Sequence, residues 1–322
     1  MKVLLVPLMV LPLLFGATAH AADAPSAFPD RPIRVIVPFA PGAAADTFGR
    51  MAGQKFGEAW GQPIVVDNRA GGGAVVGTEA VAKAPPDGHT LLLTTPAFVI
   101  NATGIRQLPY NTLRDFAPVS LFASTSMIIV SNPSLPVKTV RELIAYAKSQ
   151  PGKLTFASAG NGSINQLGME LLKLQGVQMT HVPYKGGGPA LTDVAGGQVD
   201  LMLSTVTAAQ ALLKAGRLRP IAVSTAGRTM LFPDVPAVAE TLPGFEAINW
   251  SGIVAPAGTP PAIVDKINGV LVRMLRDADV KERLAREGAE SVGNTPEQFA
   301  TFVRNEIAKW TRVVKETGAT ID

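Results

Sequence analysis

The sequence predicts an α/β protein with mainly parallel sheets. Short apolar strands alternate with amphipathic helical patterns along the 322 residues, and this alternation is typical of that fold class. Charged residues make up 17% of the chain and apolar residues 47%, which indicates a compact core and argues against a disordered chain. The length allows one large domain or two ordinary ones.

The first residues have the pattern of a secretory signal peptide. Met1-Lys2 supplies the positive charge, an apolar run covers Val3 to Phe15, and Ala19 and Ala21 occupy the small positions of a cleavage site. The apolar run is too short to span a bilayer. We therefore expect a signal peptide over residues 1–21, cleaved after Ala21, and a soluble exported protein that is most simply periplasmic. The chain has no cysteine, which excludes disulfides, thiol catalysis and a lipid-modified N-terminal cysteine.

The first part of the mature chain predicts three strands and two helices before a long β-rich run. The strands are Ile33–Phe39, Pro63–Val66 and His89–Thr95, because each is short, apolar and rich in β-branched residues or leucine. Between them, apolar residues near helical spacing predict helices over Asp46–Trp60 and Gly77–Ala84. The run Val119–Val130 then predicts continuous β-structure.

The alternation resumes after this run. A helix is expected to begin at Thr139, because Glu142 three residues later completes a capping box. A strand at Leu154–Ser158 leads to a helix whose apolar face holds Ile164 and Leu167. Further strands are predicted at Met179–Tyr184, Val199–Leu203, Leu218–Ser224 and Ile248–Ala255.

The last part of the chain predicts a loop and two helices. Three prolines indicate loop structure over Met230–Phe245. Thr259-Pro260-Pro261 opens one helix with proline in its first turn, and Thr295–Gln298 opens the last helix. Phe299 and Trp310 belong to the apolar stripe of that last helix.

Four loops at predicted strand ends contain glycine or other small residues, at 40–46, 68–73, 158–163 and 185–188. Small residues let a ligand approach the backbone, and free N–H groups at a helix start favour an anion. The Ser163 hydroxyl can bind a carboxylate, or it can serve only as a helix N-cap. Any one of these loops could be a simple tight turn, but two such loops in opposite halves of the chain favour anion binding.

Other functional classes lack their motifs. No P-loop or dinucleotide fingerprint is present, and the formal charge of +4 without a Lys/Arg block gives no support for nucleic-acid binding. No G-x-S-x-G elbow or metal-spaced cluster occurs, so we expect no catalytic residues, no metal and no cofactor. His89 and His181 are interpreted as structural histidines in apolar contexts. Asp46 and Asp67 could act in a site or could cap helices and pair with neighbouring arginines.

The run Val37-Pro-Phe-Ala-Pro-Gly-Ala-Ala-Ala-Asp-Thr-Phe-Gly-Arg50 resembles the "PF-PGG--D---R" signature of the tripartite tricarboxylate transporter substrate-binding proteins, the Bug family. Later blocks of this family are matched in order over nearly the whole mature chain. These blocks are Gly61–Arg69, Pro86–Leu93, Ala157–Ser163, His181–Asp193, Gly197–Asp200, Phe232–Pro236 and Val254–Pro260.

The resemblance implies a two-lobed periplasmic binding protein of type II topology, with two crossover strands as the hinge. One lobe would cover residues 28–123 plus 247–322, and the other residues 124–246. Such a protein traps a small organic carboxylate between its lobes and delivers it to the membrane subunits of the transporter. It would be a monomer and not an enzyme. The implied ligand-binding residues are Phe39, Gly42, Ala43, Ala44, Asp46, Thr47, Thr95, Ser158, Ala159, Gly160, Asn161, Ser163, Tyr184, Ser204 and Thr205.

Two positions depart from the family pattern. Ala43 replaces the second glycine of PGG, and Gln166 stands where a histidine often follows the Gly-Ser pair. Ser204 and Thr205 are neutral where members that bind amino acids offer an acid, so a ligand without an ammonium group is favoured. Two alternatives remain at this stage: a periplasmic carboxylate sensor for a signalling receptor, and an exported α/β enzyme.

Overall fold

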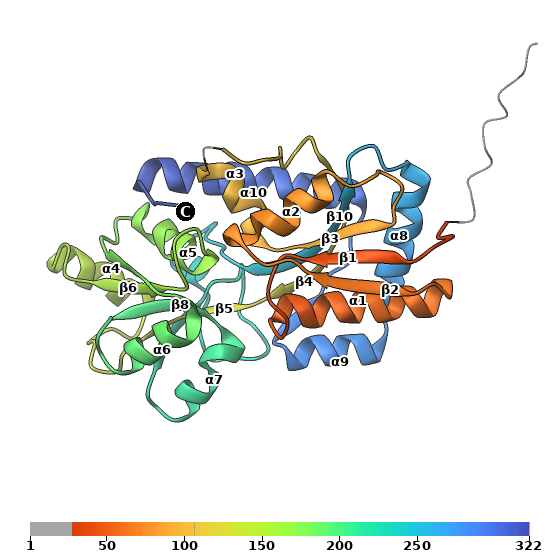
Figure 1. The fold of residues 1–322 in the computed structure, drawn as a ribbon. Coiled ribbons are helices and arrows are strands. Elements are labelled where there is room, and N and C mark those ends of the chain that lie inside the picture. Colours follow the sequence, from red (N-terminus) through yellow and green to blue (C-terminus); the bar gives the residue numbers. More distant parts are fainter. Residues whose placement is uncertain (1–27, 106, 322) are drawn as a thin grey trace, which may run out of the picture.

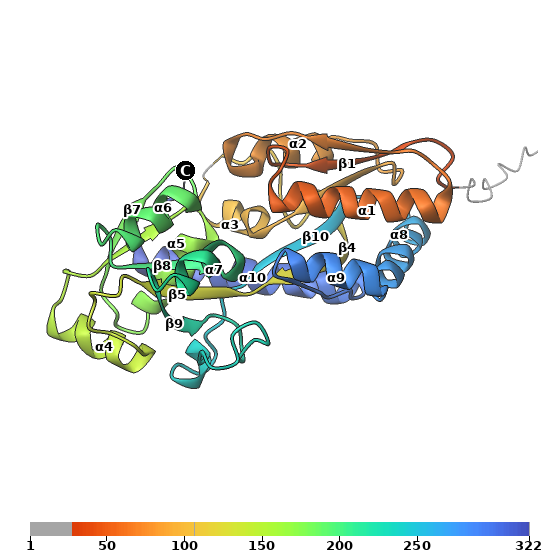
Figure 2. The ribbon, with the colours of Figure 1, turned by 90° about the horizontal axis from the view of Figure 1, so that it is seen from below.

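The computed structural model describes residues 28–105 and 107–321. The predicted signal peptide and its cleavage site lie outside these residues. The chain forms two lobes, each built on its own β-sheet with helices packed against it, and the two lobes lie side by side in both views (Figures 1 and 2). In the described part of the chain, no helix combines the length and apolar character needed to cross a membrane.

The first lobe contains a six-stranded sheet in the order β11-β4-β10-β3-β1-β2. β1 pairs in parallel with β2 and β3, whereas β10 runs antiparallel to β3 and β4, and β11 antiparallel to β4. The strands are β1 (Ile33–Val37), β2 (Ile64–Asn68), β3 (Thr90–Thr94), β4 (Phe116–Thr125), β10 (Asn249–Pro256) and β11 (Ala289–Ser291).

Six α-helices and one 3₁₀ turn accompany this sheet among the described residues. They are α1 (Ala44–Trp60), η1 (Gly72–Ala74), α2 (Val75–Ala82), α3 (Pro96–Gly104), α8 (Pro261–Met274), α9 (Ala278–Arg286) and α10 (Pro296–Thr317). Helix α1 packs closely on the sheet through glycine. An ideal Cβ at Gly49 would lie 2.5 Å from Cγ2 of Val37, so a larger residue would push α1 outward. The helix ends at Gly61, whose φ of 66° is the left-handed C-cap conformation that glycine favours.

The second lobe contains a five-stranded sheet in the order β7-β6-β8-β5-β9. β6 pairs in parallel with β7 and β8, whereas β5 is antiparallel to β8 and β9. Its strands are β5 (Met127–Ser131), β6 (Thr155–Ser158), β7 (Thr180–Pro183), β8 (Leu201–Thr205) and β9 (Arg219–Val223). Its helices are α4 (Val140–Ser149), α5 (Ile164–Lys173), α6 (Gly187–Ala195), α7 (Val206–Lys214) and the 3₁₀ turn η2 (Val238–Glu240).

The two lobes are joined by two neighbouring connections. The chain leaves β4 at Thr125 and enters β5 at Met127, and it returns into β10 at Asn249, which pairs with Thr125. The predicted β-rich run over Val119–Val130 therefore consists of two strands in different sheets. This arrangement confirms the predicted type II topology with crossover strands.

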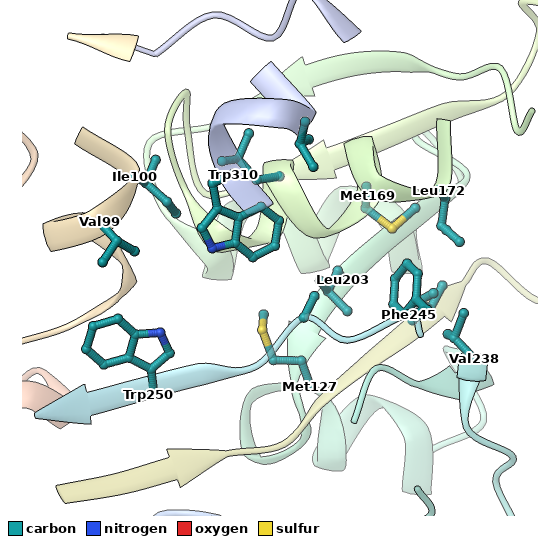
Figure 3. Close-up of a cluster of buried hydrophobic side chains, with 14 of the residues drawn as sticks. Val99, Ile100, Met127, Met169, Leu172, Leu203, Val238, Phe245, Trp250 and Trp310 are labelled. Atoms are coloured by element: carbon teal, nitrogen blue, oxygen red, sulfur yellow. The ribbon is translucent and has the colours of Figure 1, made fainter. Parts of the chain in front are cut away.

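A single hydrophobic cluster continues from one lobe into the other beneath these connections (Figure 3). Met127 of β5, Leu203 of β8 and Trp250 of β10 belong to it, and all three are almost completely buried. Trp310 of α10 also belongs to this cluster. The two lobes therefore share one packed hydrophobic core next to the strands that connect them.

The expectation of mainly parallel sheets was wrong, because both sheets are mixed. A strand that returns through the hinge must run against its neighbour, and this produces the antiparallel pairs. The helix predicted at Thr139 does begin there, since the Thr139 hydroxyl accepts a hydrogen bond from the Glu142 N–H. The capping box is shifted by one residue, because the Glu142 carboxylate accepts from the N–H of Lys138.

Candidate functional site

A cleft of about 290 Å³ lies where loops of both lobes meet. The first lobe contributes the start of α1 and the start of α3, and the second lobe contributes the starts of α5 and α7. Met127, Asn249 and Ser251 of the connecting strands also line it. The cleft is therefore bounded by both lobes and by the connecting strands.

Four helix N-termini converge on this cleft. The N-cap residues of α1, α3, α5 and α7 are Ala43, Thr95, Ser163 and Thr205, and all four line it. The first N–H groups of a helix have no partner within the helix, and the helix dipole adds a partial positive charge at that end. Four such ends around one cleft make it favourable for an anion.

Several backbone N–H groups at these ends are available to a ligand. Within the described part of the chain, no acceptor is found for the N–H groups of Ala44 and Ala45 in α1, or of Ile164 and Asn165 in α5. No residue in the described lining of the cleft carries a formal charge. Any negative charge in the cleft would therefore be compensated by neutral amides and hydroxyls.

The loop before α1 is held by Asp46 from behind the cleft. The Asp46 carboxylate accepts hydrogen bonds from the Gly42 N–H at 3.0 Å, from Arg50 Nε at 3.1 Å and from Asn68 Nδ2 at 3.0 Å. Burial acts to raise the pKa of Asp46, but these hydrogen bonds outweigh burial and hold the pKa below its ordinary value. Asp46 is therefore an anionic support of the loop, and Asp67 similarly pairs with neighbouring arginines.

The loop before α5 is held by short-range hydrogen bonds. The Ser163 hydroxyl donates to the carbonyl of Gly160 at 2.6 Å and accepts from the N–H of Gln166 at 3.3 Å. Ser163 is thus an N-cap, as one of the two interpretations expected, and it also lines the cleft.

Gln166, where a histidine is common in the resembling family, does not line the cleft. It is almost completely buried. Its Oε1 accepts from the N–H of Gly162 at 2.7 Å, and its Nε2 donates to the carbonyl of Thr320 at 3.3 Å. The side chain therefore joins the loop before α5 to the segment that follows α10.

Two further side chains of the second lobe have displaced pKa values. Burial, and then the positive charge of Lys173, lower the pKa of His181 to about 4. Burial, and then the hydrogen bond that the Tyr184 hydroxyl donates to Asp193 at 2.7 Å, raise the pKa of Tyr184 to about 12. His181 is therefore neutral near pH 7, and the Tyr184 hydroxyl is directed to Asp193.

The structure brings part of the predicted ligand-binding set to the cleft. The predicted residues that line it are Phe39, Ala43, Ala44, Thr95, Ser163 and Thr205. The predicted residues outside the lining are Gly42, Asp46, Thr47, Ser158, Ala159, Gly160, Asn161, Tyr184 and Ser204. Ala45 and Gly162 also line the cleft, and they belong to the predicted anion-binding loops 40–46 and 158–163. Residues that the sequence reasoning did not assign to the site are Phe48, Pro96, Ala97, Met127, Ile164, Asn165, Asn249 and Ser251. Proximity to a helix start could have identified several of these, whereas Met127 and Asn249 have no such signal.

The described residues do not form a metal-binding cluster of three or more histidine and acidic side chains. His89 lies between two carboxylates, with its Nε2 3.1 Å from Oδ1 of Asp30 and its Nδ1 3.3 Å from Oδ1 of Asp87. It belongs to the first lobe, outside the cleft lining. Its surroundings are therefore not the apolar context expected from the sequence, because two carboxylates lie beside the ring.

The two lobes, the crossover strands and the cleft between helix N-termini define a two-lobed solute-binding protein. The model of the tripartite tricarboxylate transporter family receptor matches residues 48–319. The chain belongs to this receptor family, as its sequence motifs indicated.

Individual relatives agree with this assignment. Protein BugT of Bordetella pertussis is 39% identical over 312 residues, which cover 95% of this chain and 96% of BugT. The structure of Rpa4515 from R. palustris with adipate is 36% identical, with a TM-score of 0.78 over 92% of this chain and 100% of that chain. MatC from Rhodopseudomonas palustris with bound malate is 35% identical, with a TM-score of 0.74 over 89% of this chain and 100% of that chain.

Proposed function

We propose that this protein is a periplasmic receptor that captures a small organic carboxylate between its lobes and delivers it to the membrane subunits of a tripartite tricarboxylate transporter. The observation that carries the proposal is the convergence of four helix N-caps on one cleft whose described lining has no formal charge. This environment favours an anion small enough for about 290 Å³. The adipate and malate bound to two relatives support a carboxylate as that anion.

The cleft chemistry also favours a ligand without an ammonium group. No acidic side chain is part of the described lining, so a buried cation would have no counter-charge there. The ligand carboxylate would accept hydrogen bonds from the N–H groups of Ala44 and Ala45 in one lobe, and of Ile164 and Asn165 in the other. Ala43 is compatible with this role, because its backbone is extended and its methyl group lines the cleft.

The proposed lobes are residues 28–123 plus 247–322, and residues 124–246. Each lobe then contains one of the two sheets, and the boundaries fall near the end of β4 and just before the start of β10. On this division, α1 and α3 belong to one lobe and α5 and α7 to the other. Closure of the lobes would then bring both pairs of helix ends to the ligand.

A thermal melting screen tests the proposal. A ligand at one hundred times its dissociation constant stabilises the folded state by about 2.7 kcal/mol. At roughly 2–4 °C per kcal/mol, the melting temperature should rise by about 5–10 °C. We expect such shifts with adipate, malate, citrate or benzoate, and none with glucose, AMP or spermidine. A shift with glucose and none with any carboxylate would overturn the proposal.

A matched pair of variants makes the screen specific for the cleft. Ala44→Asp places a fixed negative charge at the first position of α1, where the side chain is exposed and lines the cleft. It should abolish the carboxylate shift, because the ligand would meet a like charge. Val76→Asp introduces the same charge at the second position of α2, which is exposed and outside the cleft lining. It should leave the shift unchanged.

A further inference from the structure

A continuous set of hydrogen bonds connects strand β7 to the first turn of α5. Nε2 of His181 lies 2.6 Å from the Ser158 hydroxyl oxygen. That oxygen also accepts from the N–H of Gly160 at 3.1 Å, and the Gly160 carbonyl in turn accepts from the Ser163 hydroxyl at 2.6 Å. Ser163 is the N-cap whose helix presents the N–H groups of the cleft.

The His181 end of this hydrogen-bonded chain is held in place by packing on a neighbouring strand. The His181 ring stacks on Phe156, with ring centroids 4.9 Å apart and planes inclined by 23°. Phe156 and His181 are register partners in the parallel pair of β6 and β7. Ser158 is completely buried, so its hydroxyl must be satisfied inside the protein.

The protonation of His181 sets the direction of these bonds. The Ser158 hydroxyl has one proton and two neighbouring acceptors, Nε2 of His181 at 2.6 Å and the Gly160 carbonyl at 3.1 Å. A neutral imidazole with an unprotonated Nε2 takes that proton through the shorter contact, and burial favours the neutral ring. The Ser158 oxygen is then held as the acceptor of the Gly160 N–H, and the Gly160 carbonyl accepts from the hydroxyl and the N–H of Ser163.

The loop needs such a constraint because its glycines adopt positive φ angles. Gly160 has φ of 126° and Gly162 has φ of 74°. Glycine reaches these conformations without steric cost, but it also reaches many others, and the loop must be confined to one of them for binding. The side chains of Ser158 and Ser163 attach to Gly160 from both sides and restrict it.

We propose that His181 is a positioning residue of the carboxylate site. It fixes the Ser158 hydroxyl, which fixes Gly160, which holds the N-cap of α5 so that the N–H groups of Ile164 and Asn165 are directed into the cleft. His181 does not touch the ligand, because it lies outside the cleft lining. The inference rests on the proposed function only where ligand affinity is concerned, since the shape of the loop is a property of the free protein.

The first arm of the test is amide hydrogen exchange of the full mature chain without ligand. His181→Phe keeps an aromatic ring on Phe156 and removes Nε2, so exchange at Gly160 should accelerate by roughly tenfold or more, as expected for one lost buried hydrogen bond. Ser158→Ala should have the same effect. His181→Gln places an amide near the position of Nε2 and should restore most of the protection. His89→Gln, at the structural histidine of the other lobe, should leave exchange at Gly160 unchanged.

The second arm is calorimetric titration of the same proteins with adipate and with malate. Affinity should fall by roughly tenfold in His181→Phe and in Ser158→Ala, and the double variant should lose no more than either single variant. His181→Gln should bind within a few-fold of the unmodified chain. If His181 positions the loop, these variants should lose much of their affinity for the ligand while their free energy of unfolding changes little.

The two arms separate the possible failures. If exchange at Gly160 is unchanged in His181→Phe, or is altered equally in His181→Gln, the positioning role is refuted whatever the ligand. If exchange accelerates as expected but no carboxylate binds the unmodified chain, the proposed function fails, and the control of the loop by His181 stands. Affinity that is unchanged in spite of accelerated exchange refutes the assignment of His181 to the ligand site.

Discussion

The displaced pKa of His181 makes a quantitative prediction about stability. The ordinary histidine pKa is 6.5, and in the folded protein burial, followed by Lys173, lowers it to about 4. As the pH falls below 6.5, the unfolded chain therefore binds the proton before the folded chain does. The stability that the neutral ring contributes is complete above pH 6.5, declines between pH 6.5 and about 4, and is lost below that range.

The magnitude follows from the two pKa values. Between about pH 7 and about pH 4.5, the linkage relation gives a loss of roughly 2.4 kcal/mol from this one group. The ring is only half-buried, so partial exposure to solvent reduces the effect, and we expect about 1–2 kcal/mol. His181→Gln has no titrating ring and should lose that much less stability over the same interval.

Urea denaturation of both proteins at the two pH values measures this difference. All remaining ionisable groups are the same in both proteins, so their contributions cancel when the pH effect in one is subtracted from that in the other. Equal pH effects in the unmodified chain and in His181→Gln would refute the reasoning. A larger loss in His181→Gln would also refute it, because the sign would be reversed.

Three further predictions follow from the loop before α5 and from the processing of the chain. Ser163→Ala removes an N-cap, so urea titrations should show a free energy of unfolding that is lower by about 0.5–2 kcal/mol. If the hydroxyl also bonds the ligand carboxylate, calorimetry should in addition show a binding free energy weaker by about 1–3 kcal/mol. Gln166→Leu leaves the partly buried N–H of Gly162 without its acceptor, so the free energy of unfolding should fall by about 1–3 kcal/mol, whereas the exposed change Val65→Thr should matter little. The intact mass of the exported protein should correspond to an N-terminus at Ala22, and a chain that retains Met1 would contradict the predicted signal peptide.

Local pattern was sufficient to predict most strands and the long helices. Helices α1 and α10 have amphipathic stripes with clear boundary signals, because α1 ends at Gly61 and α10 begins at the Thr295 cap. Helix α3 was not predicted, because its nine residues are apolar on nearly all sides and show little periodicity. The direction of strand pairing was also not predictable, since it depends on where the chain returns and not on the strand itself.

The candidate site was predictable where it coincides with helix starts. Ala43 and Ser163 lie in the short loops that follow β1 and β6, and Thr205 is the last residue of β8. Glycine or other small residues mark these turns in the sequence. Met127 and Asn249 lie on the connecting strands, where nothing in the local sequence separates a residue that faces the cleft from one that faces the core. Their position is a consequence of how β4 and β10 pair.

The uncharged lining of the cleft has a physical advantage for a receptor of the proposed kind. Each helix end provides roughly half a positive charge, so four ends provide about two, enough for one or two carboxylates. A lysine or arginine in the cleft could instead pair with an acidic side chain when no ligand is present, and a ligand would have to break that pair. Backbone N–H groups have no such competitor and are fixed by their helices. Because α1 and α3 belong to one proposed lobe and α5 and α7 to the other, opening of the lobes would leave the ligand with only half of this positive potential. Retention of the ligand and closure of the lobes would then be two consequences of the same arrangement of helices.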